Sequence, residues 1–338
     1  MEIDELSELF GIDGLSVHTE QVREALSKVI LSDSPNIYKP AYRLISSGGK
    51  RLRSILTIAV VASLGKKIDS SVITSCVAIE LIHTASLIHD DIIDHARSRR
   101  GVQTISAKEG VNDAILVGDY LFGLAAVQAA SISKEVAGEL AEAMVGLCDG
   151  QSRELADSYN TERSINSYLE TIHGKTAMLS RAACRIGGLC GSGTETQIDS
   201  LGRFGEAFGM SFQLIDDLLD LLSSDKDMGK PVGNDIKEGV YTLPLLISLS
   251  GSSASKVRSY LTSNRAAPTK NAEIVSILMS DGSISETVKR IKHYNNTATK
   301  ALADFSANAV VGGLSSLPVV YLKWALSKSS VTLPNITI

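Results

Sequence analysis

Two acidic sequences of the form DDxxD carry the clearest chemistry in this chain. In LIHDDIIDH, Asp90 and Asp94 are four positions apart, as are Asp216 and Asp220 in QLIDDLLDL. On a helix such residues share one face, so each sequence places two carboxylates one turn apart. Two carboxylates in an apolar groove repel each other strongly unless a cation lies between them. Oxygen ligands without cysteine favour Mg²⁺ or Ca²⁺, so both sequences predict divalent-metal sites.

A solvated helix face is the alternative interpretation of each acidic sequence, because charge clusters are common on exposed helices. Both copies, however, are embedded in Leu and Ile rather than in Lys and Glu, which favours burial beside a ligand. His83 lies seven positions before Asp90 and therefore shares the helix face of Asp90 and Asp94.

Cations recur at helix ends and glycine-rich breaks. They stand in GGKRLRS, in SRRG, in HGKTA and in the Gly/Pro-rich segment 223–244, and comprise Lys50, Arg51, Arg53, Arg99, Arg100, Lys175, Lys230 and Lys237. Each group alone fits a capped or solvated helix end, and HGKTA lacks the upstream glycine and strand of a P-loop. Together with the acidic sequences they predict a site that holds metal through carboxylates and phosphate through cations.

The elements that must position these residues are helical. Helical periodicity is nearly continuous over 18–222, and strand-like alternation is scarce. The long interruption 223–244 follows the second acidic sequence, where a loop could close over a ligand. The sequence therefore predicts one all-α domain, 1–338, built as a bundle of ten or more helices.

Composition limits the location and the partners. The chain has 338 residues, is 44% hydrophobic and only 5% aromatic, and carries a net charge of −5, which excludes a general attraction to nucleic acid. Its longest uninterrupted apolar runs are too short to cross a bilayer, so no membrane span is expected. The N-terminus is acidic and the four cysteines lack CxxC spacing, so we expect a cytoplasmic protein with free thiols.

Six ordered motifs resemble those of the trans-polyprenyl diphosphate synthases, members of the isoprenyl diphosphate synthase family. They are GGKRLRS, ELIHTASLIHDDIID with RRGVQT, GDYLF, GQSREL, GKTA, and FQLIDDLLD with GKPVGNDIKEGVYTLPL, and they cover about residues 20–325. The resemblance implies a helical bundle around a central cavity, usually a homodimer. Two departures are Ser54, where the family commonly has proline, and a C-terminus without the basic tail of some members.

The resemblance also implies a role for each matching residue. Isopentenyl diphosphate would be bound by Lys50, Arg53, His83 and Arg100. About three Mg²⁺ would be bound by Asp90, Asp94 and Asp216, with Asp91, Asp217 and Asp220 acting mainly through water. The allylic diphosphate would be neutralised by Arg99, Lys175, Lys230 and Lys237, with Thr176 and Gln213 at the reacting end. The catalytic set would then comprise Asp90, Asp94, Arg99, Lys175, Asp216 and Lys230.

The implied reaction condenses isopentenyl diphosphate with an allylic diphosphate, and its product could be delivered to a membrane. In the family, bulky aromatics just before the first acidic sequence floor the product tunnel. Here Ala85 and Ser86 are small and Ile82 is moderate in size, which predicts a product longer than C20. Close helix packing is the alternative reason for small residues there. The starter, the final length, the pathway and the choice between a homodimer and one subunit of a two-component synthase stay open.

Three rival functions fit parts of the sequence. ELIH and ETIH repeat the Glu-x-x-His of di-iron bundles, with Glu154 and Glu206 as further candidate ligands, but this leaves both DDxxD copies unexplained. A non-catalytic partner subunit would be expected to lose its metal aspartates. A class I terpene cyclase usually has a different second acidic motif and lacks GGKRLR.

Overall fold

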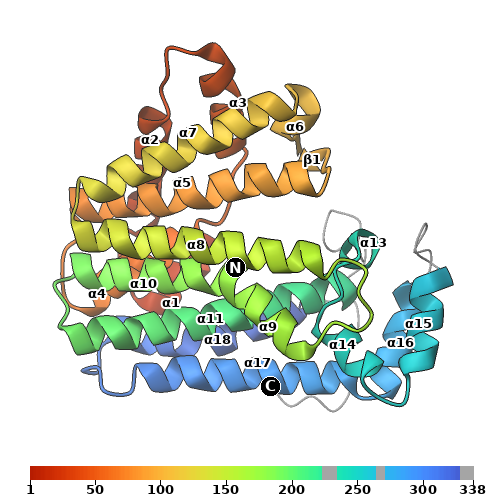
Figure 1. The fold of residues 1–338 in the computed structure, drawn as a ribbon. Coiled ribbons are helices and arrows are strands. Elements are labelled where there is room, and N and C mark those ends of the chain that lie inside the picture. Colours follow the sequence, from red (N-terminus) through yellow and green to blue (C-terminus); the bar gives the residue numbers. More distant parts are fainter. Residues whose placement is uncertain (223–233, 264–270, 328–338) are drawn as a thin grey trace. The chain divides into compact units, whose positions relative to one another are not determined.

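The computed structural model describes residues 1–222, 234–263 and 271–327 (Figure 1). The predicted all-α class and the expectation of ten or more helices are confirmed. Among the described residues, the strands are a two-residue antiparallel pair, β1 (Ser98–Arg99) and β2 (Val102–Gln103). Of the candidate lid, 223–244, residues 223–233 lie outside the described residues.

The chain divides into two compact units. Unit 1 comprises Met1–Val145, Leu179–Gly205 and Asp304–Leu314, and unit 2 comprises Gly146–Met178, Glu206–Ala303 and Ser315–Ile338. Residues of both units occur in α8 (Lys134–Ala156), α10 (Met178–Cys190), α11 (Glu195–Leu222) and α18 (Ala309–Ser327). The prediction of a single domain stays a prediction.

Unit 1 is organised around a long buried helix. Its complete helices are α1 (Ile3–Phe10), α2 (Leu15–Val29), α3 (Pro35–Ser46), α4 (Leu52–Ser63), α5 (Ser70–Ile93), α6 (Ile105–Lys108) and α7 (Val111–Ala130). Helix α5 packs against α2, α4 and α7, and α5 and α7 lie side by side (Figure 1). The Asp69 carboxylate caps α5 by accepting from the backbone N–H groups of Ser71 and Val72. A helix buried on several sides is apolar all round, which is how α5 carries its acidic end to a fixed place.

Unit 2 surrounds the second acidic sequence. Its complete elements are α9 (Ile165–Ile172), the π-helix η1 (His173–Ala177), α13 (Asn234–Glu238), α14 (Leu243–Leu249), α15 (Ala254–Ser263), α16 (Asn271–Ser280) and α17 (Ser283–Ala301). The π-helix adjoins a close approach of two backbones. A Cβ on Gly174 would lie 2.5 Å from the carbonyl oxygen of Gly146, so only glycine fits. Single π turns inside helices are frequent at functional sites, and this one carries GKTA.

Three described helices, α5, α7 and α18, are long and apolar enough on average to cross a membrane. The prediction of no membrane span was based on the length of uninterrupted apolar runs. Mean hydropathy over a window is a different measure, because it tolerates polar residues within the window. In α5, 67% of the most apolar window is buried within the protein, so packing accounts for its composition. In α7 only 33% is buried, and the absence of a span stays a prediction.

Candidate active site

The first acidic sequence ends α5, and its three aspartates have different surroundings. Asp90 is half-buried and Asp94, the C-cap, is exposed. Asp91 is buried, and its Oδ1 accepts from Arg99 Nε at 2.8 Å. Burial raises the pKa of Asp91, and the Arg99 guanidinium opposes that rise. Carboxylates at the negative end of a helix dipole are unfavourable without a cation, so this helix end suits a metal ion.

The GGKR loop, residues 48–51, gathers the cations predicted to bind isopentenyl diphosphate. Arg100 donates from Nη1 to the Gly48 carbonyl, and a Cβ on Gly49 would lie 2.8 Å from the same nitrogen. Gly49, with φ of 139°, therefore allows the Arg100 guanidinium to lie against the loop. Burial lowers the pKa of His83 well below its usual value, and the guanidiniums of Arg53 and Arg100 lower it further. The structure thus brings Arg53, His83 and Arg100 together beside the loop that carries Lys50.

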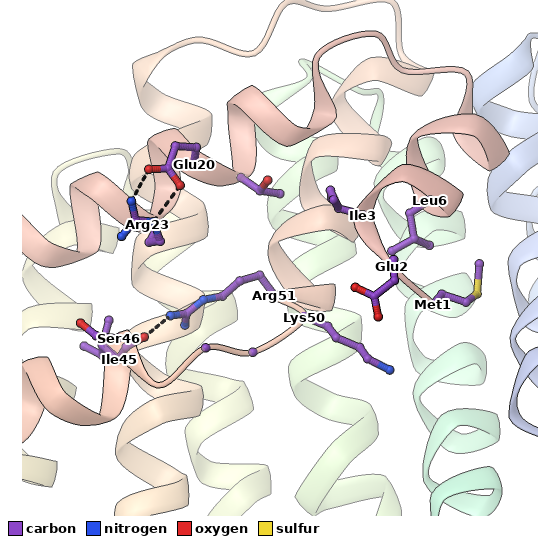
Figure 2. A pocket seen from close by; sticks show the side chains of 13 residues that line it. Met1, Glu2, Ile3, Leu6, Glu20, Arg23, Ile45, Ser46, Lys50 and Arg51 are labelled. Carbon is purple, nitrogen blue, oxygen red and sulfur yellow. Dashed lines mark hydrogen bonds and ion pairs between the residues drawn. The ribbon is translucent and has the colours of Figure 1, made fainter. Parts of the chain in front are cut away.

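A cavity of about 440 Å³ adjoins the same loop (Figure 2). It is lined by the start of α1, by α2 and by residues 45–51. Lys50 extends from the loop on the side of α1, whereas Arg51 extends the opposite way, toward the carbonyl of Ile45 (Figure 2). Two neighbouring cations of one loop are therefore directed to different places.

The second acidic sequence lies near the end of α11 and is held by neutral donors. Tyr168 Oη donates to Asp217 Oδ2, and Gln213 Nε2 donates to Asp217 Oδ1 at 2.7 Å. Thr176 Oγ1 donates to Gln213 Oε1 at 2.6 Å, which links the π-helix to this chain of hydrogen bonds. Burial raises the pKa of Asp217 to about 7, against the lowering effect of Tyr168 and Gln213.

Further acidic groups surround this sequence. Asp220 is buried, and its Oδ2 accepts from the backbone N–H of Asp235 at 3.3 Å. Burial raises the pKa of Asp235 well above its usual value, and Asp220 and Asp217 raise it further. Tyr321 Oη donates to Asp216 Oδ1 at 3.3 Å. So many carboxyl groups in one region of unit 2 would be stabilised by a divalent cation, and the donor set fits Mg²⁺.

The remaining predicted residues have varied positions. Lys175 Nζ pairs with Glu154 Oε1 at 2.5 Å, and the carbonyl of Lys237 accepts from Tyr159 Oη at 2.8 Å. Lys230 lies outside the described residues. Ile82 and Ala85 are fully buried, and Ser86 is half-buried with its hydroxyl donating to the His83 carbonyl at 2.9 Å.

Several residues of this site were missed by sequence reasoning. Tyr168, Tyr321 and Asp235 contact the second acidic sequence, yet only Asp235, inside GKPVGNDIKEG, lies in a quoted motif. Nothing in the spacing of Tyr168 or Tyr321 pointed to this contact.

The di-iron alternative is not supported. Glu80 pairs with Arg51 at 3.0 Å, and Glu154 is paired with Lys175. Within 1–222, 234–263 and 271–327, no three His, Cys, Asp or Glu side chains converge to hold a metal on their own. Mg²⁺ commonly takes one or two carboxylates and completes its shell with water and substrate phosphate, so the acidic sequences still fit it.

Comparison with known proteins gives one consistent family. Residues 34–304 match the family model described as Polyprenyl synthetase. The chain is 37% identical to heptaprenyl diphosphate synthase component 2 of Geobacillus stearothermophilus, over 70% of this chain and 74% of the relative. It is 31% identical to octaprenyl diphosphate synthase of Haemophilus influenzae, over 89% of this chain and 91% of the relative.

A solved structure extends the similarity to the fold. A polyprenyl synthase of Caulobacter crescentus CB15, complexed with calcium and isoprenyl diphosphate, aligns with a TM-score of 0.85 at 29% identity. The alignment covers 95% of this chain and 97% of that one. The two chains therefore share one architecture over nearly their whole lengths.

Proposed function

The chain belongs to the polyprenyl synthetase family, and from that premise we propose that it is a chain-elongating prenyltransferase. It condenses isopentenyl diphosphate with an allylic diphosphate to give a trans-polyprenyl diphosphate longer than C20. The observation that carries the proposal is the cation group of unit 1, where Arg53, His83 and Arg100 lie beside the GGKR loop. An anion with several charges is the ligand that such a group suits.

The enzyme uses a divalent metal, and we assign it about three Mg²⁺. The first acidic sequence would hold two through Asp90 and Asp94, and the second would hold one through Asp216. Asp91, Asp217 and Asp220 would act through water. When bound, Mg²⁺ stabilises the negative charge that develops on the leaving diphosphate. Calcium in the Caulobacter crescentus relative supports oxygen ligation of this kind.

The protein's own side chains bind and orient the two substrates. Lys50, Arg53 and Arg100 neutralise isopentenyl diphosphate, and His83, neutral at pH 7, donates a hydrogen bond. Arg99, Lys175, Lys230 and Lys237 are assigned to the allylic diphosphate. Lys175 now pairs with Glu154, so substrate binding would replace a carboxylate partner by a diphosphate oxygen. Holding the isopentenyl double bond beside the ionising carbon supplies the effective concentration for bond formation.

The product length is proposed from relatives and from α5. Heptaprenyl and octaprenyl synthases are the relatives reported above. Ala85 and Ser86, buried and half-buried, are smaller than the aromatic side chains that would close a product tunnel at these positions. Ser86→Phe should shorten the product by at least one isoprene unit, read by mass spectrometry, with Ser86→Ala as the control. An unchanged length would favour the packing interpretation and remove these residues from length control.

The assembly is proposed to be a homodimer that uses the exposed face of α7. Val111, Ile115, Leu116 and Val127 are between 43% and 62% exposed, which is unusual for large apolar side chains. A relative named component 2 makes a two-component enzyme the alternative. Light scattering of the purified chain, combined with an elongation assay, distinguishes the homodimer from the two-component enzyme. If the purified chain is a dimer and elongates by itself, it needs no second component. A cytoplasmic location stays a prediction.

The direct test is incubation of the purified protein with isopentenyl diphosphate, Mg²⁺ and farnesyl diphosphate. Mass spectrometry should show a linear diphosphate longer than C20 and release of one pyrophosphate for each added unit. A cyclic hydrocarbon would identify a terpene cyclase. No turnover by the metal-loaded protein alone would leave two alternatives, a non-catalytic subunit or one component of a two-component enzyme.

A further inference from the structure

Glu80 is a buried carboxylate that the reaction does not use directly. It lies on α5 three residues before His83, and its side chain is 3% exposed. Its Oε2 accepts from Arg51 Nη1 at 3.0 Å, and its Oε1 accepts from Ser54 Oγ at 2.9 Å. Burying an ion pair is costly, so such a pair is weak evidence for stability, and in some proteins it instead specifies one arrangement of the structure. The partners of Glu80 indicate which arrangement it specifies.

Arg51 is held in an unfavourable backbone conformation. It is the N-cap of α4, with φ of 49° and ψ of 35°, in the left-handed region that disfavours a residue with a Cβ. Its guanidinium also donates from Nη2 to the carbonyl of Ile45 at 2.9 Å. One side chain thus ties the end of α3, the GGKR loop and α5 together. Because Arg51 follows Lys50 directly, its backbone conformation sets the direction in which Lys50 leaves the loop (Figure 2).

Glu80 lies among cations. Besides burial, the guanidinium of Arg51 lowers the pKa of Arg100, whereas the Glu80 carboxylate raises it. Loss of the carboxylate would therefore have two opposite effects on an incoming diphosphate. The larger positive charge would strengthen binding, and release of Arg51 and the loop would weaken it.

We propose that Glu80 is a positioning residue, which acts through Arg51 to hold the GGKR loop in the conformation that binds isopentenyl diphosphate. The proposal rests on the proposed function and deepens it. Ser54 takes part in the same arrangement, because its hydroxyl donates a hydrogen bond to the second carboxylate oxygen of Glu80. A proline at this position could not donate that hydrogen bond.

Glu80→Gln is the test, because glutamine keeps the size and removes the charge. If positioning dominates, the KM for isopentenyl diphosphate rises about tenfold, while kcat and the KM for the allylic substrate change less than about twofold. If charge dominates, that KM falls. A fall, or no change, overturns the proposal.

A double-variant cycle tests the route through Arg51. Arg51→Gln should raise the same KM as much as Glu80→Gln does, and the double variant should be no worse than either alone. Additive effects would show that Glu80 does not act through Arg51, and would overturn the proposal. Ser54→Ala should move the same KM in the same direction by about two- to fivefold, and it provides the readout if Glu80→Gln fails to fold.

Glu139→Gln is the matched control. Glu139 is 13% exposed and pairs with Arg185 at 2.6 Å and with Arg181 at 3.5 Å, and all three residues belong to unit 1. It should lower the melting temperature and leave every KM unchanged. An equal rise in the KM for isopentenyl diphosphate would show general loosening and overturn positioning by Glu80. A wild type that elongates nothing and fails to bind isopentenyl diphosphate by calorimetry would instead overturn the proposed function, and this proposal with it.

Discussion

The two acidic sequences have the same pattern but different neighbours. In unit 1 the middle aspartate, Asp91, is paired with a cation, Arg99, at 2.8 Å. In unit 2 the middle aspartate, Asp217, is held by two neutral donors, Tyr168 and Gln213. In unit 1 the Arg99 cation opposes the rise in the pKa of Asp91 that burial causes. In unit 2 burial raises the pKa of Asp217 to about 7, so this carboxylate can bind a proton near pH 7. A repeated motif therefore does not imply a repeated electrostatic environment.

The largest expected effect separates neighbours within the first sequence. Asp90→Ala should lower kcat about a thousandfold or more, because Asp90 is assigned to metal binding, and it should leave the melting temperature nearly unchanged. Asp91→Ala should destabilise the protein by about 2 kcal/mol, because it leaves the partly buried Arg99 without its carboxylate. Steady-state kinetics and thermal unfolding measure the two effects. If the two variants exchanged these properties, Asp91 would be the metal ligand.

The helical class and the locations of both motifs could be predicted because they depend on local spacing. Aspartates at i and i+4 share a helix face whatever surrounds the helix. The partners of those aspartates depend on tertiary contacts between distant residues. Tyr168 precedes Asp217 by 49 positions, and Glu80 follows Arg51 by 29, and neither separation carries a pattern. The π-helix at GKTA was missed for the same reason, since the close approach of Gly146 to Gly174 belongs to packing.

A second test uses the pKa of Asp217, which lies near 7 in the folded protein and near 3.8 when unfolded. Between these values the folded state keeps a proton that the unfolded chain has lost. Stability from this group is therefore lost as pH rises toward 7, by up to about 1.4 kcal/mol per pH unit. Urea unfolding with a chelator present should show this slope in wild type relative to Asp217→Asn. A difference that does not vary from pH 4.5 to 7 would contradict the raised pKa.

His83 in unit 1 should show the opposite slope. Its pKa is lowered well below 6.5, so below that pH the unfolded chain binds a proton that the folded state does not. Wild type should therefore lose stability relative to His83→Gln as pH falls from 7 to 5, by at most about 1.4 kcal/mol per unit. The same urea experiment measures it. If the free energy of unfolding, relative to wild type, depended on pH in the same way for the Asp217 and His83 variants, the proposed electrostatic difference between the units would be contradicted.

The smallest effect concerns Tyr321, whose hydroxyl donates to Asp216 at 3.3 Å. This distance exceeds the usual 2.5–3.0 Å of O–H···O hydrogen bonds, so the contact is weak. Tyr321→Phe keeps the ring, which stacks on Phe212 with centroids 5.0 Å apart, and removes only the donor. Without that donor the Asp216 carboxylate is freer to turn toward a metal ion. The affinity for Mn²⁺, measured by electron paramagnetic resonance, should therefore rise by about two- to threefold. Tyr168→Phe is the matched comparison: it removes a donor from buried Asp217 and should have the larger effect on stability. A larger loss of stability from Tyr321→Phe than from Tyr168→Phe would contradict this ranking of the two hydrogen bonds.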